Sequence, residues 1–282
     1  MKLTVLRVAL TLACAGLIAQ QNNDLGFTDT PMQPNGKWHV HDSARPQPTV
    51  VTPGGAEALM MPAPSDATIL LAGGSDLSNW SMTDGKPASW DMKAGVLSSG
   101  KGMLRTKAEF ADVQLHVEFA TPSVVKGDSQ GRGNSGVYLM GAFEIQVLDS
   151  YQNPTYADGG ASAMYGQFPP LVNASRKPGL WQAYDIIFTA PRFKATGELE
   201  KPAIVTVLHN GVLVHNATAF YGPTQHKRID AYSPKLTHGP ILLQDHGNPV
   251  RFRNIWAFRW RFVSRNVESR ATTSPIDGRC AG

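Results

Sequence analysis

The chain has 282 residues, in which Lys and Arg outnumber Asp and Glu by 26 to 22, a formal net charge of +4. Two of the basic residues, Lys2 and Arg7, lie in a leader that we expect to be removed, so the mature chain is close to neutral. Because no run of Lys and Arg occurs elsewhere, nucleic acid is not expected as a partner.

The first residues predict export. Two basic residues precede an apolar run at 8–19, which is the pattern of a secretory signal peptide over residues 1–19. The run is shorter than the roughly 20 residues that a membrane span needs, so no spanning helix is expected. Cleavage after Ala15 or Ala19 would give a secreted or periplasmic protein. Cys14 ends a short stretch that loosely resembles a lipobox, so a lipid anchor on Cys14 is the alternative.

The cysteine count excludes two kinds of stabilisation. One cysteine, Cys14, lies in the leader and the other, Cys280, lies near the end of the chain. A structural disulfide within the mature chain is therefore not expected, and no Cys and His spacing typical of a zinc site occurs.

The remaining chain divides into three parts. Residues 20–65 are polar and rich in proline, a composition that buries too little apolar area to offset the entropy of ordering, so we predict a flexible arm or linker. Residues 66–262 form one candidate domain without a repeat or a break in composition. Residues 263–282 are predicted to be a loose tail.

The domain is predicted to be all-β. In residues 111–119 apolar and polar side chains alternate, with Val113, Leu115, Val117 and Phe119 inward and Gln114, His116 and Glu118 outward. Residues 203–209 and 212–215 flank Asn210-Gly211, the dipeptide favoured in a two-residue hairpin turn. Residues 181–190 and 250–262 are further strands, and no window has a helical period. These strands indicate two packed antiparallel sheets, a sandwich or jelly roll.

The last of these strands has two different faces. Strict alternation places Phe252, Trp256, Phe258 and Trp260 on one face and Arg251, Arg253, Arg259 and Arg261 on the other. Trp256 and Trp260 are therefore predicted to belong to the core.

Two segments, 134–149 and 239–256, carry polar groups at alternate positions among apolar ones. Alternation places Glu144 and Gln146 on one face of a strand, and Gln244 and His246 on one face of another. Arg251 and Arg253 also share a face, so we expect a single concave face with a carboxylate, an imidazole, amides and guanidinium groups. That composition is typical of a site for a polar ligand.

Seven motifs in this order resemble one known family. They are Asp76-Leu-Ser-Asn-Trp80, Trp90 with Gly95-Val-Leu97, Asn134-Ser-Gly-Val-Tyr-Leu139, Phe143-Glu-Ile-Gln-Val-Leu-Asp-Ser-Tyr151, Lys177-Pro-Gly-Leu-Trp181, Gly239-Pro-Ile-Leu-Leu-Gln-Asp-His-Gly247 and Val250-Arg-Phe-Arg-Asn-Ile-Trp256. Together they resemble the 3-keto-disaccharide hydrolase domains of bacterial secreted proteins. The resemblance covers most of residues 66–262 and implies a concanavalin A-like jelly roll that acts on glycosides oxidised at sugar carbon 3. One departure is Gln182, where the family pattern has Asn.

The implied chemistry is elimination followed by hydration. A carbonyl at C3 acidifies the hydrogen on C2, so a base can remove it and the enolate can expel the glycosidic oxygen from C1. Glu144, between Phe143 and Ile145, is the predicted base, with a pKa raised by burial, or else a metal ligand. His246 is predicted to be a proton shuttle or metal ligand, and Arg251 to hold the keto oxygen. A divalent cation held by Glu144 and His246 is therefore a further expectation.

The predicted substrate contacts fall into three chemical groups. Hydroxyl-binding residues are Asn134, Tyr138, Gln146 and Gln244, although Asn134 can equally be part of a turn. Tyr165 and Trp181 are predicted to stack on a sugar ring. Arg253 either contacts substrate or forms an ion pair. Alternation places Asp149 on the opposite face of the strand from Glu144 unless a β-bulge intervenes, so Asp149 either contacts substrate or braces the site.

Two other function classes remain open at this point. One is a carbohydrate-binding module without catalysis, for which aromatic platforms and amides suffice. The other is a conventional retaining glycoside hydrolase that uses Glu144 and Asp149, which requires the two carboxyl groups to lie about 5–5.5 Å apart.

Overall fold

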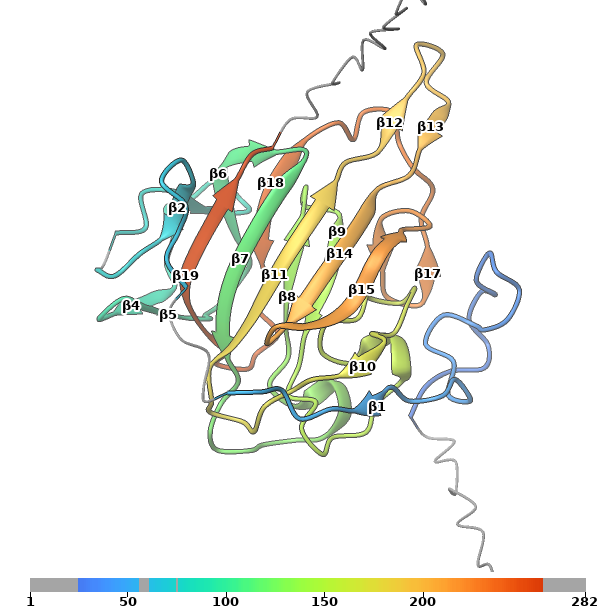
Figure 1. The fold of residues 1–282 in the computed structure, drawn as a ribbon, viewed down its shortest axis with the longest axis horizontal. Coiled ribbons are helices and arrows are strands. Elements are labelled where there is room, and N and C mark those ends of the chain that lie inside the picture. The colour runs from blue at the N-terminus through green and yellow to red at the C-terminus, as the bar shows by residue number, and fades with distance from the viewer. Residues whose placement is uncertain (1–24, 56–60, 75, 261–282) are drawn as a thin grey trace, which may run out of the picture.

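The computed structural model describes residues 25–55, 61–74 and 76–260. The predicted signal peptide, Cys14, and the predicted tail lie outside these ranges and stay predictions. Apart from two short 3₁₀ helices, η1 (Ser129–Gly131) and η2 (Ala157–Gly159), the regular structure in these ranges is β-strand (Figure 1). The described part of the chain has no helix that is both long enough and apolar enough to cross a membrane.

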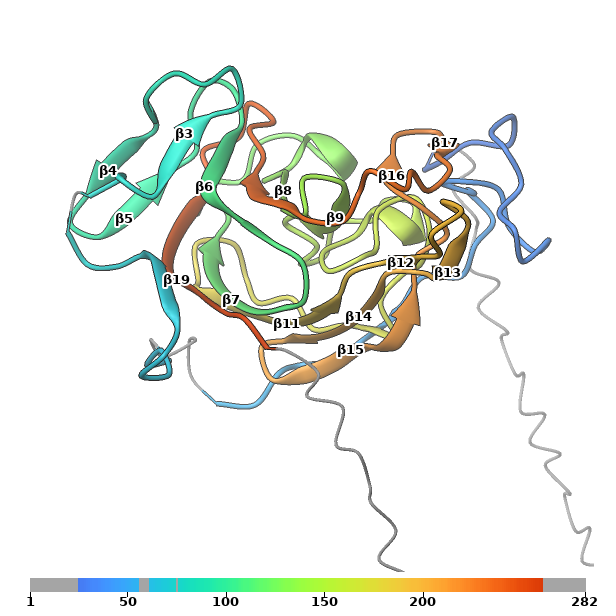
Figure 2. The ribbon, with the colours of Figure 1, turned by 90° about the horizontal axis from the view of Figure 1, so that it is seen from above.

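Most of the described strands form two antiparallel sheets. The smaller sheet has the order β3 (Trp80–Met82), β6 (Leu104–Phe110), β18 (Gly239–Leu243), β8 (Ser135–Leu139), β9 (Phe143–Val147). The larger has the order β15 (Val212–Ala219), β14 (Ile204–His209), β11 (Gln182–Thr189), β7 (Val113–Ala120), β19 (Arg251–Phe258), β5 (Val96–Ser98), β4 (Asp91–Lys93), and β2 (Thr68–Leu71) also pairs with β19. The sheets form two layers, with β8 and β9 over β11 and β14 (Figure 2). The predicted all-β sandwich is confirmed.

Three small sheets complete the described strands. They are β12 (Arg192–Phe193) with β13 (Leu199–Lys201), β16 (Thr224–Gln225) with β17 (Arg228–Ile229), and β1 (Thr49–Val50), which pairs in parallel with β10 (Val172–Asn173).

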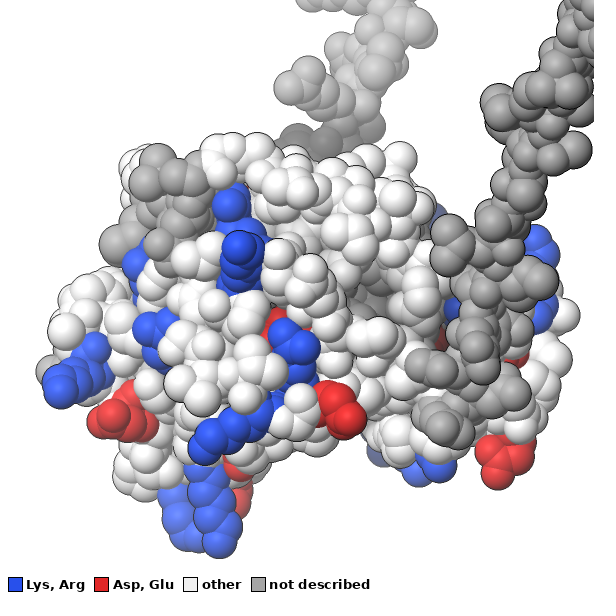
Figure 3. All heavy atoms as spheres, turned by 90° about the horizontal axis from the view of Figure 1, so that it is seen from below, with Lys and Arg blue, Asp and Glu red and all other residues white. Residues whose placement is uncertain are grey.

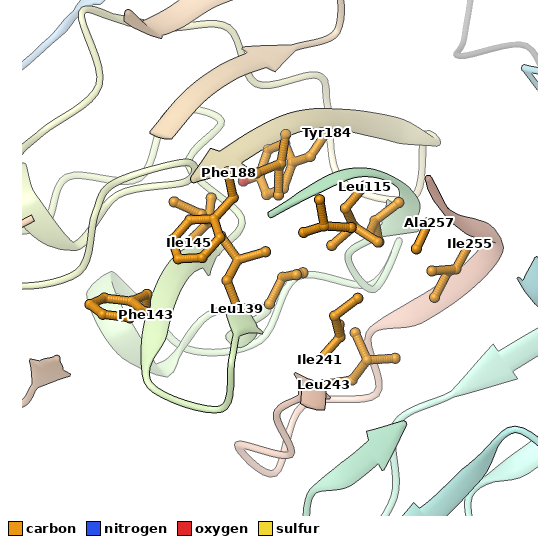
Figure 4. Close-up of a cluster of buried hydrophobic side chains, with 14 of the residues drawn as sticks. Leu115, Leu139, Phe143, Ile145, Tyr184, Phe188, Ile241, Leu243, Ile255 and Ala257 are labelled. Atoms are coloured by element: carbon orange, nitrogen blue, oxygen red, sulfur yellow. The ribbon is translucent and has the colours of Figure 1, made fainter. Parts of the chain in front are cut away.

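The core lies between the two large sheets. Leu115, Tyr184 and Phe188 of the larger sheet face Leu139, Phe143, Ile145, Ile241 and Leu243 of the smaller one (Figure 4). Each of these side chains is fully buried. Because Phe143 and Ile145 point into the core, alternation turns Glu144 to the opposite face of β9.

The alternation predicted for strand β7 is confirmed, because the inward side chains all belong to the core: Val113, Leu115, Val117 and Phe119. Its other face is also covered: His116 and Glu118 are buried. The predicted hairpin at Asn210-Gly211 is present between β14 and β15, and both turn residues have positive φ, as this turn type requires.

Strand β19 corrects the prediction for Trp256. The register of β19 against β7 shifts between Arg253 and Trp256, and Asn254 has a φ of 47°. This bulge reverses the alternation, so Ile255 and Ala257 enter the core. Trp256 pairs with His116 and stacks on its ring, with the centroids 5.2 Å apart, on the outer face of the sheet.

The predicted flexible arm is wrong for residues 25–55, which pack against the domain (Figure 1). Val40 and His41 are fully buried, and β1 pairs with β10. The segment contains few large apolar side chains, but its polar groups have buried partners. Arg45, for example, donates a hydrogen bond of 3.0 Å to the carbonyl of Gln167. The composition argument omitted stabilisation of this kind.

Charged side chains do not form a continuous basic surface on the face shown in Figure 3. Lys and Arg gather over one part of that face, with Asp and Glu between them, and a large part of it is uncharged.

Candidate active site

A pocket of about 420 Å³ lies on the outer face of the smaller sheet. Its lining comes from β8, β9, the end of β18, the η1 and η2 loops and the β16–β17 hairpin, which lies beside β9 (Figure 2). The lining residues are Gln130, Asn134, Tyr138, Glu144, Gln146, Tyr156, Tyr165, Thr224, Gln225, His226, Gln244 and His246. The pocket therefore brings together most of the residues that the sequence predicted for the site.

Glu144 lies at the base of this pocket because of the β8–β9 register. Tyr138 pairs with Glu144, and Gly136 pairs with Gln146. A side chain at position 136 would collide with Oε1 of Glu144, so the glycine leaves the space that the carboxyl group occupies. The backbone N–H of Glu144 donates a hydrogen bond of 2.9 Å to Oγ1 of Thr224, which ties β9 to the β16–β17 hairpin.

Burial raises the pKa of Glu144 to about 8, against a lowering contribution from a hydrogen bond with Tyr138. The side chain is only 3% exposed. The Tyr138 phenol oxygen also accepts a hydrogen bond of 3.1 Å from Nε2 of Gln244, which leaves its own proton for the carboxylate. A carboxyl group in this environment can exchange a proton near neutral pH.

Tyr156, Tyr165 and His226 form one wall of the pocket. The hydroxyl groups of Tyr156 and Tyr165 are 2.9 Å apart, and the Tyr165 hydroxyl is 3.0 Å from Nδ1 of His226. Burial raises the pKa of both phenols above the ordinary tyrosine value, and Glu144 adds to the effect. Burial lowers the pKa of His226, and the nearby His41 lowers it further. These groups therefore hold their protons as phenols and a neutral imidazole.

Three buried amide oxygens of the pocket have no hydrogen-bond donor among the described residues: Oδ1 of Asn134, Oε1 of Gln146 and Oε1 of Gln244. Their NH₂ groups are already used, because Asn134 and Gln146 donate to Gln130, and Gln244 donates to Tyr138. Buried polar atoms are nearly always paired in folded proteins. The three oxygens are thus positioned to accept hydrogen bonds from the hydroxyl groups of a ligand.

The arginines and Trp181 lie elsewhere, which corrects the prediction of a single face. The chain crosses from the smaller sheet to the larger one between β18 and β19, so Arg251 and Arg253 belong to the other sheet. Arg253 Nε is 2.6 Å from Oε2 of Glu118, and its guanidinium group lies 4.0 Å from the ring centre of Trp181. Arg251 donates a hydrogen bond of 3.0 Å to the carbonyl of Gly179. Of the two roles predicted for Arg253, the structure therefore shows the ion pair. Arg251 lies outside the pocket.

Asp149 lies outside the Glu144 pocket, whereas His246 lines it. Asp149 Oδ2 is 2.7 Å from Nε of Arg132, and Asp149 lines a neighbouring hollow of about 360 Å³ rather than the pocket of Glu144. Asp149 is therefore placed to brace the loop. His246 lines the pocket from its exposed rim.

The expected divalent cation finds no complete ligand set in the described ranges. No three His, Cys, Asp or Glu side chains there are grouped so as to hold a metal ion. Glu144 and His246 alone define no coordination geometry. The cation therefore stays a prediction, and no step of the chemistry below depends on it.

Five residues of the pocket were not predicted from sequence: Gln130, Tyr156, Thr224, Gln225 and His226. All come from loops, from the short helix η1 or from a very short hairpin, where no alternation marks a face. His226 occupies the turn of that hairpin, and no spacing to another ligand residue distinguishes it in the sequence.

Comparison with known proteins agrees with this fold. A candidate glycosyl hydrolase from Parabacteroides distasonis ATCC 8503 is 44% identical, with a TM-score of 0.69, and the match covers 77% of this chain and 93% of that one. A second candidate glycosyl hydrolase of that organism is 17% identical with a TM-score of 0.50, covers 70% and 94%, and supports the fold alone. No curated protein matches at a significant level.

The family model of the 3-keto-alpha-glucoside-1,2-lyase-like domain matches residues 67–257. The match spans both sheets and every residue that lines the Glu144 pocket. The chain is therefore a member of the 3-keto-alpha-glucoside-1,2-lyase-like family, with a glycosyl-hydrolase-like domain.

Proposed function

We propose that this protein cleaves 3-keto-glycosides by removal of the C2 proton, elimination of the anomeric substituent and addition of water, with Glu144 as the base. The observation that carries the proposal is the state of that carboxyl group. It is buried in a pocket, and its pKa is raised to about 8. A base of this kind removes a carbon-bound proton well near neutral pH.

The pocket also argues against a conventional retaining mechanism. That mechanism needs a second carboxyl group about 5–5.5 Å from the first. Glu144 is the one carboxylate among the described residues that line the pocket. Asp149, the other candidate, is held by Arg132 at the neighbouring hollow.

The proposed steps balance as follows. Glu144 takes the proton from C2, and the electron pair of that C–H bond forms an enolate whose oxygen is at C3. Once Glu144 is protonated it no longer needs the proton of Tyr138, so the Tyr138 phenol is the group that donates a hydrogen bond to this developing charge. The enolate expels the glycosidic oxygen from C1, which takes a proton from an acid of the pocket, for which His246 at the rim is our choice. Water then adds its oxygen to C1 and a proton returns to C2, so the net reaction is hydrolysis.

Substrate recognition rests on the amide oxygens. The unpaired oxygens of Asn134, Gln146 and Gln244 accept hydrogen bonds, and sugar hydroxyls donate them. A keto group cannot donate, so the ring position that faces these amides is one that still carries a hydroxyl. This expectation fits a sugar oxidised at one carbon only.

The test offers the purified protein a 3-keto-glucoside and its unoxidised parent, each with and without a chelator. Turnover of the keto-glucoside alone is expected, and equal rates on both compounds would refute activation by the carbonyl. Loss of activity only with chelator would establish a metal. Binding of the sugar without consumption would instead indicate a carbohydrate-binding module.

A matched pair of variants tests the base. Glu144→Gln keeps the shape of the side chain but cannot accept the C2 proton, so turnover should be abolished. Glu198→Gln makes the same chemical change at a residue that is 66% exposed and outside the pocket lining, and it should leave turnover unchanged. Near-normal turnover in Glu144→Gln would remove Glu144 from the mechanism.

A further inference from the structure

The N-terminal segment places a buried histidine behind the wall of the pocket. His41 precedes the range that the family model covers, 67–257, and it does not line the pocket itself. Its ring lies against three residues that do: the ring centroids are 4.1 Å from Tyr156, 4.8 Å from Tyr165 and 5.2 Å from His226.

Asp158 of η2 fixes the orientation of His41. Its Oδ1 is 3.0 Å from Nδ1 of His41, and its Oδ2 accepts a hydrogen bond of 3.0 Å from the backbone N–H of the same residue. Both side chains are fully buried. Arg45 and Gln33 also contact Oδ2 of Asp158, at 3.7 and 3.3 Å, so the carboxylate is held from several sides.

The other ring nitrogen of His41 is exceptional. Nε2 is buried and has no hydrogen-bond partner among the described residues. A buried polar atom without a partner costs stability. Such local departures from the most stable choice are expected at functional sites.

We propose that His41, oriented by Asp158, is a positioning residue for the pocket. The His41 ring holds Tyr156, Tyr165 and His226 in place, so that the chain of hydrogen-bonded phenols ends on Nδ1 of His226. The inference rests on the proposed function, because this wall belongs to the same site. It makes residues 25–45 part of the catalytic unit, in addition to the family domain.

Attachment of the N-terminal segment to the domain does not by itself explain the His41–Asp158 pair. Gln47 donates a hydrogen bond of 2.7 Å to the carbonyl of Thr155, and β1 pairs with β10. Neither contact involves the side chain of Tyr156, Tyr165 or His226. Gln47→Ala is therefore a matched control that weakens the attachment and leaves His41 in place.

A double-mutant cycle tests the proposal through turnover. His41→Phe keeps a ring against the wall and removes the bond to Asp158, and it should lower kcat by up to about 100-fold, the cost of misplacing an active group by about 1 Å, with KM nearly unchanged. Tyr165→Phe in that background should cost much less than in the wild type, because both changes act on one network. Gln47→Ala should lower the midpoint of thermal unfolding and leave kcat unchanged.

Additive losses in the cycle, or a fall of kcat in Gln47→Ala equal to that in His41→Phe, would overturn the proposal. His41→Asn supplies a second variant if His41→Phe does not fold. Its amide can still reach Asp158, but it removes the ring, so it should also lower kcat.

A second measurement needs no substrate. In ¹⁵N-labelled protein, the chemical shift of His226 Nδ1 reports its hydrogen bond with Tyr165. That shift should change in His41→Phe and should not change in Gln47→Ala. An unchanged shift in His41→Phe refutes the positioning role. If the wild type cleaves no 3-keto-glycoside, the proposed function fails, and this measurement still decides the role of His41.

Discussion

The buried carboxyl group of Glu144 should make the protein less stable as pH rises. In the unfolded chain this group releases its proton near 4.5, whereas in the folded protein its pKa is raised to about 8 by burial. Between these values the folded state binds a proton that the unfolded state has released, so the free energy of unfolding falls with rising pH. Below about 4.5 both states hold the proton and above about 8 both have lost it, which confines the effect to that window.

The size of the effect follows from the shift. A shift of about 3.5 pKa units, at about 1.36 kcal/mol per unit, corresponds to about 5 kcal/mol over the whole window. Between pH near 5 and pH near 9 the wild type should therefore lose about 4 kcal/mol that Glu144→Gln, which cannot titrate, does not lose.

The assay is urea unfolding followed by tryptophan fluorescence across this pH range, for the wild type and for Glu144→Gln. The difference between the two curves removes other groups that titrate in the same window. One is His116, whose pKa is lowered by burial but raised to about 9 by Asp185 and Glu118, on the outer face of the larger sheet. Parallel curves for the two proteins would show that Glu144 is not a buried neutral acid, and the reasoning for a raised pKa would be refuted.

Three further predictions concern activity and the outer face. The kcat/KM for a 3-keto-glucoside should rise with pH up to about 8, because the base must be deprotonated, and a flat profile over this range would contradict this role of Glu144. Gly136→Ala should displace the Glu144 carboxyl group and lower kcat by about 100-fold, whereas Gly54→Ala, at a glycine with open space around it, should have no effect in the same assay. Arg253→Met should leave kcat unchanged and cost about 2–3 kcal/mol in urea unfolding, because Glu118 loses a charged partner; a loss of kcat at unchanged stability would return Arg253 to the site.

Which face of a strand a residue occupies could be predicted, because alternation is a local property of the chain. It correctly separated Glu144 and Gln146 from Phe143 and Ile145 on β9. It failed at Trp256, since the bulge at Asn254 adds a residue that no local pattern indicates.

Membership of a sheet could not be predicted in the same way. His246 and Arg251 lie five positions apart, but between them the chain passes from one sheet to the other. Pairing partners are set by contacts between distant strands. Side-chain alternation alone therefore placed Arg251 and Arg253 on the wrong sheet. The histidines His41 and His226 were missed for a related reason, because each reaches the site from a segment without regular alternation.

The attachment of the N-terminal segment has a consequence for the order of folding. Gln33, His41 and Arg45 have partners that lie 117 to 133 positions later in the chain. Contacts of such long sequence separation close only after the intervening chain has been ordered. During synthesis these residues appear first and must wait for η2 and the loop after it. The back of the pocket therefore cannot be completed before the chain has been made as far as Gln167.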